Sequence, residues 1–373
     1  MKAKQWLCAA LAGACMVSAA GAADSVGDLS PQGAKAYRDE IMRLQNTYGK
    51  AAVASDAVLN SMWTGLSLAR LIDFDGDEIP ELYCSAGMEG QWLYTYDNGL
   101  RNLEIPQNVS NFSTDLSPST LLYVGADKAY LVDGHGVMNG GTVTYYTKQG
   151  DRMTAALTYQ DAIGEYPDGS YGVHICTLNG KSVTPEELEK GLSDFAAGME
   201  KQWYSFWKYS SVCKSVSGTM GDTVAALRTL TNPKAVASED RIMLDGKPVQ
   251  IAVYKINGDN YFRLRDLAAV LSGTKAQFEV KWDGAQQRID LIEGQPYTPV
   301  GGENSAVLPA REQASLTTAA VCRSGQPLEL TAYRIAGNNF FKLRDLAAAM
   351  DFAVVWDEQA RTVRIDSPAP YLE

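Results

Sequence analysis

The sequence has little histidine, no basic run and no Gly-x-Ser-x-Gly motif. Only His135 and His174 occur in 373 residues, and a Ser/His/Asp hydrolase would need one of them as its base. His135 lies in a turn-like Asp-Gly-His-Gly segment and is the one expected to be exposed, whereas His174 lies between apolar strand residues. These absences disfavour an enzyme that uses a histidine base.

Cysteine is also sparse, with six residues in the chain. Those beyond the N-terminal segment lie too far apart for a C-x-x-C metal pair or a dense disulfide framework; they are Cys84, Cys176, Cys213 and Cys322. Their apolar, strand-like surroundings favour small buried residues. A disulfide between Cys176 and Cys213 is the alternative.

No long apolar run follows the N-terminus. The run from Trp6 to Val17 is shorter than the roughly 20 residues that span a bilayer, and it follows two lysines and ends in small residues. This pattern is typical of a secretory signal peptide, predicted over residues 1–22. We therefore expect a secreted or cell-surface, extracytoplasmic protein with no transmembrane segment in the mature chain.

Acidic residues outnumber basic ones, 44 to 33, which gives a formal net charge of −11. Two of the 33 basic residues lie in the predicted signal peptide, so the mature balance is 31 minus 44, or −13. Such a surface repels phosphate backbones. Nucleic acid is not an expected partner, and the envelope or extracellular partner is not identified by the sequence.

Residues 31–210 predict an α+β domain, an antiparallel meander sheet with flanking helices. An amphipathic helix is expected over 31–48 because apolar residues recur at helical spacing. Short strand-like runs separated by Gly and Asn turn signals follow it. The segment Thr184–Glu187 has the form of a capping box, so a second helix is predicted there.

The C-terminal part contains an internal repeat. The segment Tyr254–Ala269 recurs as Tyr333–Ala348, and Val-x-Trp-Asp follows both copies. A single copy is too small to bury both its faces, so two copies packed together are the expected stable unit. The predicted boundaries are a linker over 214–238, repeats over 239–293 and 316–367, and a spacer over 294–315.

The repeat signature, Asn-Tyr-Phe-x-Leu-Arg-Asp-Leu-Ala with a later Val-x-Trp-Asp, resembles the copper amine oxidase N-terminal-like or stalk domain of exported clostridial proteins. The resemblance implies an extracytoplasmic accessory module of small α+β repeats. It does not imply the oxidase, which needs three copper-binding histidines and a Thr-x-x-Asn-Tyr-Asp/Glu motif. Tyr261 follows Asn260, but Asn257 replaces the threonine and Phe262 the acid. No copper is expected.

The sharpest local signal is the acidic loop Asp-Phe-Asp-Gly-Asp-Glu-Ile-Pro-Glu, residues 73–81. Clustered carboxylates suit calcium, which takes six or more oxygens, and the loop resembles the calcium loops of integrin-type β-propeller repeats. That resemblance implies a metal site made of Asp73, Asp75, Asp77, the carbonyl of Ile79, and Glu81. Because Glu78 stands where glycine is usual, its backbone is expected to avoid the left-handed region. An exposed acidic turn is the alternative.

The sequence thus favours an exported, non-enzymatic accessory or binding protein with a stalk-type module and a structural calcium loop. The first alternative is an extracytoplasmic hydrolase whose site lies in residues 31–210. A periplasmic-type ligand-binding or inhibitor protein is the second.

Overall fold

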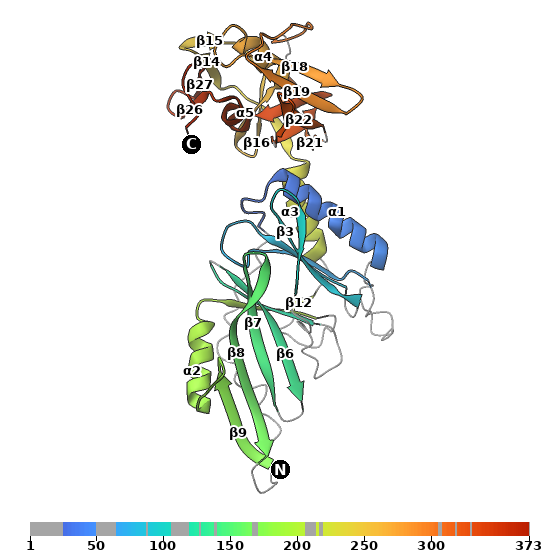
Figure 1. The fold of residues 1–373 in the computed structure, drawn as a ribbon, viewed down its shortest axis with the longest axis vertical. Helices are drawn as coiled ribbons and strands as arrows, with labels where there is room; N and C mark the ends of the chain where they lie inside the picture. The colour runs from blue at the N-terminus through green and yellow to red at the C-terminus, as the bar shows by residue number, and fades with distance from the viewer. Residues whose placement is uncertain are drawn as a thin grey trace. The chain divides into compact units, whose positions relative to one another are not determined.

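A computed structural model describes residues 25–49, 65–86, 89–105, 119–126, 128–137, 140–165, 171–205, 214–215, 219–304, 308–317, 319–328 and 330–372. The predicted signal peptide lies outside these residues, as does Cys213. The chain divides into two compact units, Met1–Leu227 and Arg228–Glu373, and each is described by itself (Figure 1).

The N-terminal unit contains the helices α1 (Pro31–Tyr48) and α2 (Pro185–Phe195), and α3 (Thr219–Thr231) crosses the boundary between the units. Its first sheet has the order β1-β2-β3-β4, and its second has the order β10-β9-β8-β7-β6-β5-β11-β12. The strands are β1 (Leu68–Ile72), β2 (Glu81–Ser85), β3 (Gln91–Tyr96), β4 (Leu100–Leu103), β5 (Ser119–Val124), β6 (Ala129–Val137), β7 (Gly140–Gln149), β8 (Arg152–Glu165), β9 (Tyr171–Leu178), β10 (Lys181–Ser182), β11 (Glu200–Ser205) and β12 (Lys214–Ser215).

The C-terminal unit contains the helices α4 (Leu264–Leu271) and α5 (Leu343–Met350). Its strands are β13 (Lys234–Ala237), β14 (Arg241–Leu244), β15 (Lys247–Val249), β16 (Val253–Ile256), β17 (Asp259–Arg263), β18 (Phe278–Asp283), β19 (Arg288–Glu293), β20 (Arg311–Gln313), β21 (Ser315–Leu316), β22 (Ala320–Arg323), β23 (Gln326–Leu328), β24 (Ala332–Ile335), β25 (Asn338–Lys342), β26 (Ala353–Asp357) and β27 (Thr362–Asp366).

The α+β fold class is wrong, because the described residues are predominantly β, with many antiparallel sheets and five helices. Two sheets replace the single meander predicted for residues 31–210. The predicted turn at Asp133–Gly134 is also wrong, since β6 continues through it to Val137. Runs of alternating apolar and polar residues show where strands are. The pairing of distant strands decides how far each strand extends and which sheet it joins.

Helix α1 begins where the sequence predicts, because Ser30 accepts a hydrogen bond from the Gly33 N–H and proline occupies the first turn. Its buried stripe includes Tyr37, Ile41 and Leu44. The stripe packs beside β3 and β4, so the helix covers the first sheet (Figure 1).

One hydrophobic cluster joins the two sheets of the N-terminal unit. It contains Leu68 and Tyr83 from the first sheet and Leu122 and Leu131 from the second. Phe74, from the loop between β1 and β2, is fully buried in the same cluster. The acidic loop is therefore anchored at the junction of the two sheets.

The two repeats of the C-terminal unit are interwoven. Strand β14 of the first repeat pairs in parallel with β27 of the second, and β19 of the first pairs with β22 of the second. Strands β17 and β25 meet as antiparallel neighbours at the centre of a seven-stranded sheet. Each repeat thus completes the sheets of the other, and one core serves both.

The aromatic pairs of the two repeats are buried on both faces of the central sheet. Phe262 and Phe341 lie in the main core, whereas Tyr261 and Phe340 lie in a second cluster on the opposite face. All four are at most 4% exposed. In the described part of the chain, no helix combines the length and apolar character needed to cross a membrane.

Candidate cation site

The acidic loop between β1 and β2 is ordered by its own carboxylates. Asp73 accepts hydrogen bonds from the N–H groups of Gly76 and Glu78, at 2.7 and 3.0 Å. Asp77 Oδ1 accepts one from the Ile79 N–H at 2.8 Å. Short polar side chains that bond backbone groups a few residues ahead favour tight turns. The loop conformation therefore follows from the order of its residues.

Glu78 does adopt the left-handed conformation, with a φ of 67°, so the expectation that its backbone avoids this region is wrong. The Glu78 carbonyl accepts a hydrogen bond from the Asp28 N–H at 2.8 Å. A left-handed non-glycine residue costs about 1 kcal/mol, and the contacts with the segment before α1 hold it there. The N-terminal segment and the loop are one local structure.

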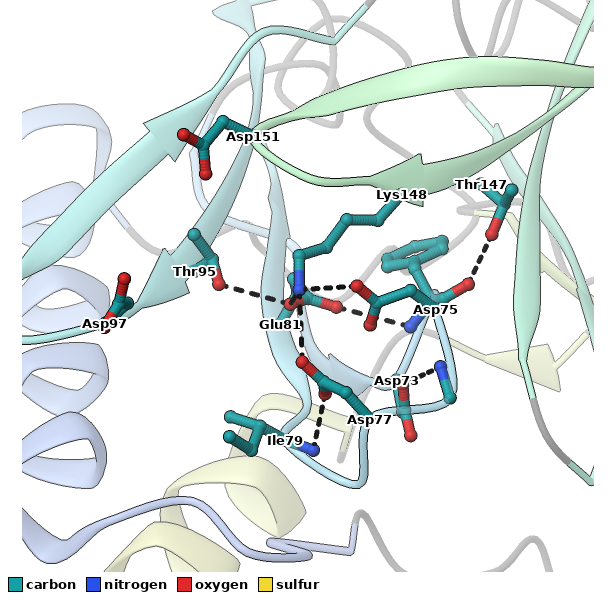
Figure 2. Close-up of polar contacts among 12 residues, drawn as sticks. Asp73, Asp75, Asp77, Ile79, Glu81, Thr95, Asp97, Thr147, Lys148 and Asp151 are labelled. Atoms are coloured by element: carbon teal, nitrogen blue, oxygen red, sulfur yellow. Dashed lines mark hydrogen bonds and ion pairs between the residues drawn. The ribbon is translucent and has the colours of Figure 1, made fainter.

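A lysine ammonium group lies at the centre of the carboxylates (Figure 2). Lys148 Nζ, from β7, is 2.9 Å from Asp75 Oδ2, 2.9 Å from Glu81 Oε1 and 3.6 Å from Asp77 Oδ2. Its side chain is only 9% exposed. The loop of the first sheet is thereby bound electrostatically to a strand of the second sheet.

Glu81 is the most deeply buried member of this group, with no exposed side-chain surface. It accepts hydrogen bonds from the Phe74 N–H and the Thr95 hydroxyl, both at 3.3 Å. Burial raises the pKa of Glu81 to about 7, although Lys148 opposes the shift. Burial lowers the pKa of Lys148, but Asp75 and Glu81 outweigh it, and the net shift is upward. The ammonium stays charged at any ordinary pH.

The structure brings together most of the residues that the sequence predicted as a metal site. Asp75, Asp77 and Glu81 surround Lys148, and Asp73 offers an oxygen within 4.8 Å of those of Asp75 and Glu81. The N–H of Ile79, whose carbonyl is the predicted ligand, donates a hydrogen bond to Asp77 Oδ1. Lys148 itself was missed, because it lies 67 residues after Glu81 (148 minus 81), and no local pattern marks a lysine whose partner strand is so distant.

The cluster has the chemistry to bind a hard divalent cation, which prefers carboxylate and carbonyl oxygens. Asp75 Oδ1 is buried and has no hydrogen-bond partner. The ammonium, however, already takes the position from which a cation would contact Asp75 and Glu81. A calcium ion could use these oxygens only after Lys148 moved aside, because two cations at one point repel each other strongly.

Charges in the repeat signature form ion pairs within the C-terminal unit. Arg263 contacts the fully buried carboxylate of Asp266 at 2.5 Å. Lys342 of the second repeat lies 2.9 Å from Asp259 of the first. The first pair fixes the start of α4 to its own strand, and the second joins one repeat to the other.

Comparisons of the whole chain with protein-family models, curated proteins and solved structures found no match. The resemblance to the stalk domain therefore rests on the residues of the repeat alone and stays a prediction.

Proposed function

We propose that this chain is an exported, non-enzymatic accessory or binding protein, in which the interwoven repeats are a stalk-type module. The proposal rests on one observation: the residues of the repeat signature pack and pair within the C-terminal unit. Its aromatic pairs fill two cores, and its charges, such as Arg263 and Asp266, pair with each other. Residues with these contacts stabilise the fold of the module, as expected for a domain that supports or presents another domain.

Export is tested by expressing the full chain and a variant without residues 1–22. The full chain should appear outside the cytoplasm, with the mass of a chain that begins at Ala23, while the truncated chain stays inside. Retention of an uncleaved full chain in the cytoplasm would contradict the proposal. Binding is tested by sedimenting the purified mature protein with isolated cell envelopes, with the C-terminal unit deleted as the control.

The alternative of a hydrolase with its site in residues 31–210 requires a general base, which a cluster of acids or a histidine can supply. Among the described side chains of that region, His174 is the only histidine, and its Nε2 lies 2.5 Å from Asp161 Oδ1; the side chain of His135 lies outside the described residues. Assays with ester, peptide and glycoside substrates decide between the two. Turnover of any of these substrates would replace the accessory function with the enzymatic one, and its loss in His174→Gln would identify that histidine as the base.

For the acidic loop we propose that calcium competes with Lys148 for the same oxygens, with the unpartnered Asp75 Oδ1 as an additional ligand. In this account Lys148 is the resident cation, and calcium has the structural role of stiffening the loop when it displaces the ammonium. Replacing Lys148 with methionine should therefore strengthen calcium binding, because it removes the competing charge and leaves the carboxylates in place.

A further inference from the structure

A second group of metal-ligating side chains lies on the β8–β9 hairpin. Asp161 of β8 is the direct cross-strand partner of Cys176 of β9, so both side chains project from the same face of the sheet. His174 precedes Cys176 by two residues along β9 and therefore shares that face. The strand register alone thus places an aspartate, a histidine and a cysteine side by side.

The geometry of these three side chains suits one metal ion. A carboxylate oxygen of Asp161, a ring nitrogen of His174 and the sulfur of Cys176 all lie within 4.8 Å of one another. Tetrahedral zinc has bonds of about 2.0 Å to nitrogen or oxygen and about 2.3 Å to sulfur, which implies ligand-to-ligand distances of roughly 3.2–3.6 Å. His174 Nε2 lies 2.5 Å from Asp161 Oδ1, so a metal ion would take the place of the hydrogen bond between them and separate the two atoms to about 3.3 Å.

The surroundings of the thiol supply negative charge that a cation would balance. The Val183 N–H donates to the Cys176 carbonyl at 3.0 Å, which holds the start of α2 against β9. Burial, Asp161 and then Glu186 of α2 raise the pKa of Cys176. A thiol in such surroundings is a poor nucleophile, so the arrangement does not suit a cysteine-dependent enzyme.

This group differs in chemistry from the acidic loop. Calcium takes oxygen ligands alone, whereas thiolate and imidazole ligands select zinc and related transition metals. Asp161 also lies eight residues along β8 from Met153, the strand partner of Lys148, and thus roughly 25 Å from that lysine's position on the sheet. The two groups can be tested independently.

We propose that Asp161, His174 and Cys176 bind one zinc-type ion, with the fourth coordination position open to water beside Glu186. Binding forms a sulfur–metal bond and releases the Cys176 proton to solvent. The site would contribute stability to the outer part of the second sheet, because the ion joins β8 to β9.

The test uses the reduced, metal-free mature chain. Zinc is titrated against a coloured chelator, and cobalt is added separately to detect a thiolate-to-cobalt charge-transfer absorption. The proposal expects one zinc per chain and the charge-transfer band. Cys176→Ser should abolish the band, and both Cys176→Ser and His174→Gln should weaken zinc binding by at least about tenfold.

Cys322→Ser is the matched control, because Cys322 is a free thiol that is 5% exposed, as is Cys176, but lies in the other unit. It should change neither zinc affinity nor the cobalt band, and Asp75→Asn should also leave both unchanged. If Cys176→Ser does not fold by circular dichroism, Asp161→Asn, at a more exposed position, provides the same test by its loss of zinc affinity.

Three results would overturn the proposal. The first is the absence of a one-to-one zinc complex at micromolar concentration, and the second is a cobalt band that persists in Cys176→Ser. The third is a disulfide between Cys176 and Cys213 in the protein isolated without reductant, because the thiol would then not be available to a metal.

Discussion

At the scale of single residues, Lys148 has the largest expected effect on stability. Lys148→Met removes the cationic partner of the fully buried Glu81, and breaking a buried pair from one side costs about 3–5 kcal/mol. The control is Lys190→Met, because Lys190 and its partner Asp194 have side chains that are 76% and 66% exposed. Exposed pairs contribute about 0–1 kcal/mol. Urea unfolding at about pH 8 measures both variants, and equal losses of stability would contradict the assigned role of Lys148.

Glu81 should give the protein a distinctive dependence on pH. The pKa of Glu81 is raised from 4.5 to about 7 in the folded state, so between these values the folded state binds a proton that the unfolded state does not. The contribution of this proton to the free energy of unfolding is then fully present below about pH 4.5 and is lost as pH rises through about 7. The free energy of unfolding falls by about 3 kcal/mol over this range. Glu81→Gln should remove this component, and the measurement is unfolding free energy against pH for both proteins. Parallel curves from pH 4 to 8 would refute the assignment.

The sequence predicted the carboxylates of the acidic loop but not the group between them. Five acids in nine residues, four of them at positions typical of a cation loop, are a local signal that needs no tertiary information. Lys148 is the one lysine of β7, and nothing in its local sequence separates it from the other lysines of the chain. Only the packing of β7 against the loop distinguishes it. Similarly, Glu78 is left-handed because Asp28, 50 residues earlier (78 minus 28), bonds its carbonyl.

At the scale of elements, the contact between the segment before α1 and the acidic loop should tolerate little change. Gly27 has a φ of +47°, and a Cβ there would lie 1.9 Å from the Glu78 carbonyl oxygen. Gly27→Ala should therefore cost about 1–3 kcal/mol beyond the backbone strain itself. Gly150→Ala is the control, because Gly150 also has a positive φ of 61° but nothing within 4 Å of its Cβ position. Thermal unfolding of the two variants compares them, and equal shifts would show that the contact is not made.

Elements with strong local signals were predicted well, and their assembly was not. Helix α1 has its cap, its proline and its apolar stripe within one segment, and α2 has the predicted capping box of Thr184 and Glu187. The division of the strands into two sheets depends on long-range pairing, such as that of β11 with β5. Pairing at that distance leaves no periodic signal in the sequence, so the predominance of β structure was underestimated.

At the scale of the whole molecule, the interwoven repeats predict a cooperative C-terminal unit. Residues 228–372 should fold alone, because α4, α5 and the strands of both repeats share one core. Residues 228–293 should not fold, because β14 and β19 would lose their partners β27 and β22 and the hydrophobic core would be halved. Circular dichroism and the dispersion of amide proton resonances test both fragments. A folded first repeat would show that the interweaving is not required.

Lys148 acts as the resident cation of a calcium-type loop, and thermal unfolding with calcium or with a chelator is the decisive test of this role. A ligand that binds only the folded state raises the melting temperature as its concentration increases. We expect millimolar calcium to raise the melting temperature of Lys148→Met clearly more than that of the wild type, and Asp75→Asn added to Lys148→Met to abolish the rise. If calcium leaves the melting temperature of Lys148→Met unchanged, or stabilises the wild type at least as strongly, the ammonium does not occupy a calcium position.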